Sequence, residues 1–142
     1  MIINHSHQQN LLKIGEVASV SSIPIKTIRY YDDLGLLNPH ITRSKAGYRL
    51  FDQSIFNRLS FIRRSQSLGL SLKEIEHILK IYDQGDIPCG VAKEVLLDKL
   101  DNIEQQIEQL QILRTELKGI LLGWQFAERL DDKICPNIQQ NR

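Results

Sequence analysis

This 142-residue chain has two cysteines, Cys89 and Cys135, whose thiols could bind a metal ion or undergo oxidation. Two thiols are too few for the disulfide framework of a small secreted domain. Thiolates bind soft metal ions and oxidise reversibly to disulfides, whereas many free cysteines are simply small buried side chains. No histidine stands at a spacing that suggests a base for a cysteine nucleophile, so we do not expect an enzyme.

A second set of candidate functional groups consists of basic side chains in the first part of the chain. Residues 1–84 hold 11 Lys and Arg against 7 Asp and Glu, a balance of +4, whereas residues 85–142 hold 7 against 10, a balance of −3. A basic front half suits a polyanion such as nucleic acid, although an excess of four charges also fits a solvated surface.

Short helices and a hairpin would position these basic groups. The apolar spacing predicts helices over residues 12–20 and 24–34, with Pro24 in the first turn of the second helix and Gly35 as its stop. Two short helices joined by a tight turn form a helix-turn-helix candidate. Residues 43–47 then predict a hairpin tip, and residues 48–51 its return strand.

Three further helices follow the hairpin. Asp52 is the expected N-cap of a third helix, and Ser71 with Glu74 forms a capping box for a fourth. After a linker at 84–88, a helix over residues 89–125 of roughly 55 Å carries a heptad seam. A seam of that length needs a second helix, most simply from a second copy of the chain. Its positions are Leu96, Leu100, Ile103, Ile107, Leu110, Arg114, Leu117, Leu121 and Trp124.

Several motifs carry a family resemblance: Ile14-Gly15-Glu16-Val17-Ala18, Ile28-Arg29-Tyr30-Tyr31-Asp32, Gly35-Leu36-Leu37, Gly47-Tyr48-Arg49, Leu68-Gly69 and Ser71-Leu72-Lys73-Glu74-Ile75. In order and spacing they resemble the MerR family of transcriptional regulators over residues 12–125. The resemblance implies a mainly α fold, with a winged helix-turn-helix DNA-binding domain followed by a long antiparallel coiled-coil helix. It also implies a homodimer that binds double-stranded promoter DNA, represses or activates transcription by distorting that DNA, and works with RNA polymerase.

The expected organisation has five parts: a flexible N-terminus (1–11), the DNA-binding domain (12–82), a hinge (83–88), the dimerisation helix (89–125) and a C-terminal effector loop (126–142). The second helix would turn its apolar face to the core and its polar face to bases and phosphates, and the hairpin would lie over the DNA backbone or the minor groove. Tyr31 and Tyr48 fit the core equally well, and Arg58, Arg63, Arg64 and Lys73 could extend the footprint. The candidate DNA-binding residues are Lys26, Thr27, Arg29, Tyr30, Tyr31, Arg43, Lys45, Tyr48 and Arg49.

The resemblance also gives the thiols a role. In metal-sensing members, a cysteine at the start of the dimerisation helix, here Cys89, and one in the C-terminal loop of the other subunit, here Cys135, bind the inducing ion. Trp124 stands where mercury and zinc sensors carry a further cysteine. Two thiolates suit Hg(II) best, with other divalent heavy-metal ions as alternatives. A reversible disulfide between Cys89 and Cys135 would instead make a redox sensor of the same fold.

The location of the protein follows from what the sequence lacks. No segment approaches the roughly 18 apolar residues that span a bilayer. Residues 1–10 do not contain the apolar core of a signal peptide. We therefore expect a soluble, cytoplasmic protein with no membrane partner.

Overall fold

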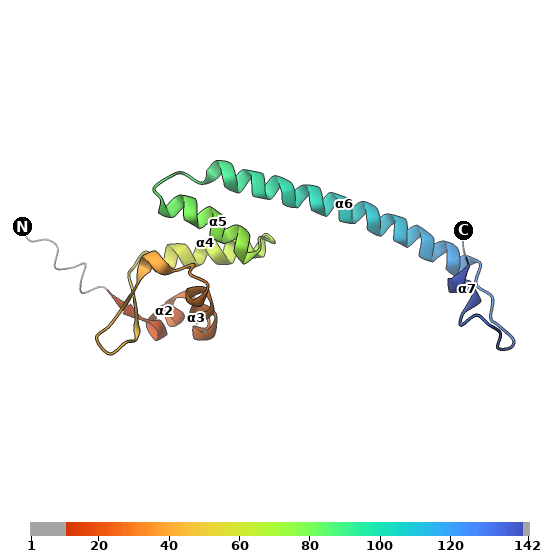
Figure 1. Ribbon diagram of the computed structural model, residues 1–142, viewed down its shortest axis with the longest axis horizontal. Coiled ribbons are helices and arrows are strands. Elements are labelled where there is room, and N and C mark those ends of the chain that lie inside the picture. The colour runs from red at the N-terminus through yellow and green to blue at the C-terminus, as the bar shows by residue number, and fades with distance from the viewer. Residues whose placement is uncertain (1–10, 141–142) are drawn as a thin grey trace, which may run out of the picture. The chain divides into compact units, whose positions relative to one another are not determined.

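The computed structural model describes residues 11–140 and divides into two compact units, residues 1–96 and 97–142. Except for Leu11, the expected flexible N-terminus lies outside the described residues. The fold is mainly α, with one small sheet, as predicted (Figure 1). Its elements are β1 (Leu12–Lys13), α2 (Ile14–Ser21), α3 (Ile25–Asp33), the 3-10 helix η1 (Asn38–His40), β2 (Ile41–Arg43), β3 (Arg49–Phe51), α4 (Ile55–Ser67), α5 (Leu72–Asp83), α6 (Cys89–Leu122) and α7 (Pro136–Gln139).

Helices α2 and α3 form the predicted helix-turn-helix. Ser22 ends α2 in the left-handed region, at φ +60°. Pro24 then caps α3, and its carbonyl accepts the amide protons of Thr27 and Ile28, so the ring occupies a place where its missing N–H costs nothing. Gly35, at φ +81°, closes α3 with a backbone conformation that other residues rarely adopt.

The sheet has the order β1-β3-β2, and both pairings are antiparallel. The hairpin partners are Ile41 with Phe51 and Arg43 with Arg49, which confirms the expected wing. Strand β1 corrects the sequence analysis, which placed residues 12 and 13 at the start of a helix. Leu12 instead pairs with Phe51, and the helix begins one residue after Lys13.

Helix α4 also begins slightly later than predicted. Its N-cap is Ser54 rather than Asp52, whose carboxylate accepts the amide proton of Ser54 at 2.9 Å. The capping box of α5 is confirmed. The Glu74 amide donates to the Ser71 hydroxyl at 3.1 Å, and the Ser71 amide donates to the Glu74 carboxylate at 2.8 Å.

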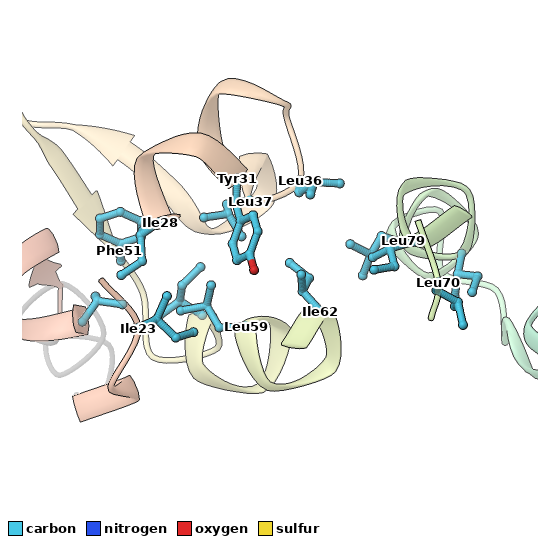
Figure 2. Packing of buried hydrophobic residues seen from close by; sticks show 14 residues of the cluster. Ile23, Ile28, Tyr31, Leu36, Leu37, Phe51, Leu59, Ile62, Leu70 and Leu79 are labelled. Atoms are coloured by element: carbon cyan, nitrogen blue, oxygen red, sulfur yellow. The ribbon is translucent and has the colours of Figure 1, made fainter. Parts of the chain in front are cut away.

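The hydrophobic core joins the helix-turn-helix, the sheet and helices α4 and α5 (Figure 2). Val91, Ala92 and Val95, from the first turns of α6, pack against it half-buried. The core therefore ties the beginning of α6 to the basic unit. Its buried members are Val17, Ile23, Ile28, Tyr31, Leu36, Leu37, Phe51, Ile55, Leu59, Ile62, Leu70, Ile75, Ile78 and Leu79.

Helix α6 is one uninterrupted helix of 34 residues, and it ends at Leu122, three residues earlier than predicted. None of its residues is buried. Seven apolar positions of the heptad are 44–66% exposed, an apolar stripe that we call the seam. A stripe of this kind on a long helix needs a packing partner. The seam consists of Leu96, Leu100, Ile103, Ile107, Leu110, Leu117 and Leu121.

Candidate nucleic-acid interface and thiol positions

An open groove of about 740 Å³ separates α2 and α3 from the hairpin. Four basic side chains line it, against one acidic side chain, Glu16. The groove is therefore a basic channel between a helix and a hairpin, and such a surface suits a phosphate backbone. The basic members are Lys13, Arg29, Arg43 and Arg49.

Helix α3 presents most of its predicted contact residues to solvent. Lys26, Arg29 and Tyr30 are exposed, and Thr27 is half-buried. Tyr31 is different, because it is only 2% exposed and its hydroxyl donates to the Gln66 side chain at 2.6 Å. Figure 2 shows its ring within the hydrophobic cluster. Tyr31 thus anchors α3 to α4 rather than facing a ligand.

The tip of the hairpin is held by its own polar groups. The Tyr48 amide donates to the Ser44 hydroxyl at 3.2 Å, and the Arg43 guanidinium donates to the Gly47 carbonyl at 3.0 Å. Gly47, at φ +89°, makes the tight turn possible. Lys45 and Tyr48 are both exposed beside it. The hairpin is therefore a preformed wing with basic and aromatic groups at its tip.

Lys13 is a groove residue that the sequence analysis missed. Its ammonium nitrogen lies 5.3 Å from the centre of the Tyr48 ring, within range of a cation–π contact. The residue was overlooked because it was assigned to a helix, whereas β1 brings it beside the wing. A basic residue directly before the Ile14-Gly15-Glu16 motif is the signal that could have revealed it.

The Arg49 side chain is held by two carboxylates at the end of α3. Its Nε donates to Asp32 at 2.5 Å and its Nη2 donates to Asp33 at 3.3 Å. Two carboxylates at the end of α3 thus occupy a side chain that the sequence analysis assigned to DNA. The ion pair joins the base of the wing to the helix.

Arg58 also departs from expectation, because it is 5% exposed and cannot extend a DNA footprint. Its Nε donates to the Leu36 carbonyl, and its two terminal nitrogens donate to Asp83 at 2.6 and 2.8 Å. Arg58 therefore links α4 to the turn after α3 and to the last residue of α5. Arg63, Arg64 and Lys73 are exposed, as a surface role requires.

Stability should depend on pH through Asp83. The hydrogen bonds from Arg58 hold the pKa of the Asp83 carboxyl below its ordinary value, although partial desolvation opposes the shift. Because the folded-state pKa is lowered, this stabilisation is present above the unfolded pKa of about 4 and is lost as the pH falls through the folded value. Urea unfolding at about pH 7 and about pH 3 should show a smaller acid-induced loss in Asp83→Asn than in the wild type. An equal loss in both proteins would contradict the assignment.

The two thiols belong to different units. Cys89 is the first residue of α6 and is exposed. Cys135 is half-buried and precedes α7, and its amide donates to the Gln139 side chain at 2.8 Å. Among residues 11–140, no three His, Cys, Asp or Glu side chains gather closely enough to hold a metal ion.

The segment that carries Cys135 is closed into a loop. The Asn137 side chain accepts the amide proton of Gln125 at 3.0 Å and donates to the Gln125 carbonyl at 2.7 Å. This pair of bonds, which we call the Asn137 clasp, returns the chain to the end of α6, where Trp124 lies half-buried. Cys135 is thereby held near the C-terminal end of its own long helix.

Over residues 11–140, no helix combines the length and the apolar character needed to cross a bilayer.

Comparison with known proteins assigns the fold to a family. Residues 12–81 match the model for the MerR HTH family regulatory protein, and residues 56–120 match the model for MerR, DNA binding. The chain is 35% identical over 127 residues to the mercuric resistance operon regulatory protein of Bacillus cereus, which covers 89% of this chain and 94% of the relative.

Two solved structures are similar in fold. The transcription regulator PbrR691 from Ralstonia metallidurans CH34, solved in complex with lead(II), matches with a TM-score of 0.71 and 27% identity, over 87% of this chain and 94% of its own. HiNmlR, a MerR family regulator bound to promoter DNA, matches with a TM-score of 0.53 and 26% identity, over 79% and 88%. The helix-turn-helix, the wing and the long α6 agree with these matches. The chain belongs to the MerR family of transcriptional regulators.

Proposed function

We propose that this regulator is a homodimer that binds promoter DNA and responds to a thiophilic divalent metal ion, with Hg(II) as the first choice. In this proposal Cys89 of one subunit and Cys135 of the other bind the ion. The ion acts as a regulatory signal and takes part in no catalytic step. Promoter binding implies work in the cytoplasm together with RNA polymerase.

The seam of α6 supports the dimer. Seven large apolar side chains, each about half exposed, form a stripe along the helix that is interrupted at one heptad position by Arg114. Burying such a stripe in a coiled coil favours association by roughly 25 cal/mol for each Å² of apolar surface removed from water. A second copy supplies a matching seam without any other partner. We assign residues 12–82 to DNA binding, 83–88 to the hinge, 89–125 to dimerisation and 126–142 to the effector loop.

Antiparallel pairing supports a thiol site shared by two subunits. It would bring the start of one α6, with Cys89, to the end of the other α6, where the Asn137 clasp holds the loop with Cys135. Since the described residues of one chain gather no three metal-binding side chains, a site made by two chains is the simplest way to increase the number of donors.

The choice of Hg(II) rests on the donors and on the relatives. Two thiolates satisfy linear Hg(II), whereas Zn(II) prefers four ligands. One relative is named for mercuric resistance, and one structural neighbour was solved with lead(II). Trp124 stands near the end of the long helix and supplies no thiolate.

The basic groove supports promoter binding. We propose that Lys26, Thr27, Arg29 and Tyr30 contact DNA from α3, and that Arg43, Lys45 and Tyr48 do so from the wing. Ion binding would clamp the effector loop onto the hinge of the other subunit. The resulting shift of α5 relative to α6 would change the angle between the two DNA-binding domains and so distort the promoter.

The observation that carries the metal proposal is the pair of thiols, one exposed at the start of α6 and one held in the clasped loop near the end of α6. The test is transcription in vitro from a promoter selected by the purified protein, with Hg(II), Cd(II), Pb(II), Zn(II) and Cu(I) added separately. We expect induction by Hg(II) at the lowest concentration and one bound ion per protomer. Induction by none of these ions would overturn the metal response.

A redox response is the second candidate, because the same two thiols could form a disulfide between subunits. Titration of free thiols after peroxide treatment separates the two possibilities. Ultraviolet charge-transfer absorption with metal, together with both thiols still titrating after peroxide, supports metal sensing. Loss of both thiols with a transcriptional response to peroxide alone supports the disulfide.

A further inference from the structure

We propose that Asp32 and Arg49 form a positioning pair that sets the wing at a fixed distance from α3, and that Arg49 does not itself contact DNA. The inference deepens the proposed function, since it rests on the groove between α3 and the wing as the DNA-binding surface. The pair would hold α3 and the wing, the two elements that contact DNA, in a fixed relative position.

Among residues 11–140, Phe51 and Ile41 anchor the base of the wing in the hydrophobic core, whereas the tip of the wing has few other attachments. Strands β2 and β3 are three residues long, and within the described residues 11–140 the second edge of β3 pairs with the two-residue β1. The hydrogen bonds at the wing tip, from Tyr48 to Ser44 and from Arg43 to Gly47, stay within the hairpin. The tip is therefore well formed by itself, but these bonds do not fix where it lies relative to α3.

Arg49 supplies that connection. It is the first residue of β3 and pairs with Arg43 across the hairpin, so it stands at the base of the wing tip. Its guanidinium donates through Nε to Asp32 at 2.5 Å, and Asp32 lies in the last turn of α3. One ion pair thus joins the wing directly to the helix that carries Lys26 and Arg29.

Burial distinguishes this pair from an ordinary surface ion pair. The side chains of Arg49 and Asp32 are 18% and 12% exposed, whereas that of Asp33 is 69% exposed. A charge-assisted hydrogen bond that is largely shielded from water fixes geometry, but an exposed pair contributes little. Asp32 is the main partner, and Asp33 at 3.3 Å is a minor one.

The charges argue against direct contact with phosphate. Arg49 carries one positive charge, and its two carboxylate neighbours together carry two negative charges, so the group of three is net negative. A phosphate approaching Arg49 would meet both carboxylates. The other basic members of the groove are better placed for that contact: Lys13, Arg29 and Arg43.

The test compares Asp32→Asn with Asp33→Asn in the full-length protein, by measuring specific affinity for the selected promoter over a range of salt concentrations. Removing a negative charge beside a polyanion should by itself strengthen binding. We expect the opposite for Asp32→Asn, an affinity about tenfold weaker, because the wing loses its fixed position. The salt slope should stay unchanged, since no phosphate contact is lost.

Asp33→Asn is the matched control, because it removes the same charge from the next residue and should bind as well as the wild type or slightly more tightly. Arg49→Gln should lower affinity as Asp32→Asn does, and the double variant should be no weaker than the weaker single variant. A salt slope reduced by about one in Arg49→Gln would instead identify a phosphate contact. The salt slope of Arg49→Gln can be measured whether or not Asp32→Asn folds.

Two failures are distinguishable. Wild-type protein that binds no duplex specifically would overturn both the proposed function and the inference. Specific wild-type binding, with Asp32→Asn as tight as Asp33→Asn, would overturn the inference alone. Far-ultraviolet circular dichroism of each variant would show that the affinities refer to folded protein.

Discussion

Replacing Cys89 with serine is expected to abolish the transcriptional response to Hg(II) while leaving promoter affinity within about twofold of the wild type. A serine hydroxyl is a hard, neutral oxygen and does not replace a thiolate on a soft ion. Cys89 is exposed at the first residue of α6 and is not part of the hydrophobic core, so the fold should tolerate the change. Promoter transcription with and without Hg(II), beside a DNA-binding titration, measures both effects.

Two further variants serve as controls for Cys89→Ser. Cys135→Ser should lose the same response, since the proposal needs both thiols. His77→Ala should respond normally, because the exposed His77 on α5 has no part in the site. Normal induction of Cys89→Ser by each of the five ions would place the sensing group elsewhere in the chain.

The largest loss of stability should follow from replacing Arg58 with alanine. The change leaves the Asp83 carboxylate and the Leu36 carbonyl without the guanidinium that now binds both, and it removes a side chain that is only 4% exposed. Breaking one side of a buried pair costs about 3–5 kcal/mol. We expect the lower end, about 3 kcal/mol, since the Asp83 side chain is 28% exposed. Urea unfolding at neutral pH measures the difference.

Arg63→Ala is the matched control for Arg58→Ala, because Arg63 is an exposed arginine on the same helix. Its effect on the free energy of unfolding should stay within about 0.5 kcal/mol. Arg58→Lys should recover only part of the loss, since an ammonium group cannot form the paired hydrogen bonds that Arg58 donates to Asp83. Equal stability of Arg58→Ala and Arg63→Ala would show that the linkage contributes nothing.

Local signals in the sequence predicted much of the fold. Pro24 and Gly35 marked the ends of α3, and Ser71 with Glu74 marked the start of α5, because caps and turns depend on residues a few positions apart. The continuous α6 followed from its heptad spacing. Strand β1 was missed because two residues are too few to show an alternating pattern, and only the pairing of Leu12 with Phe51 creates the strand.

The roles of the buried charges could not be read from the sequence. Arg49 lies 17 residues from Asp32, and Arg58 lies 25 residues from Asp83. The packing of the helices decides which arginines face solvent and which bind carboxylates. The sequence alone does not distinguish the two kinds of arginine. The assignment of individual DNA contacts and of the two thiols to a metal stays a prediction from residue type and position.

The Asn137 clasp has a consequence for the chemistry of Cys135. Its two hydrogen bonds to Gln125 join the two ends of the intervening segment into a closed loop. The Cys135 sulfur is therefore confined to a smaller volume than it would reach in an open chain end. Confinement of this kind raises the effective concentration of the thiol toward any group that docks beside α6. A single amide side chain thereby closes the ring that carries Cys135.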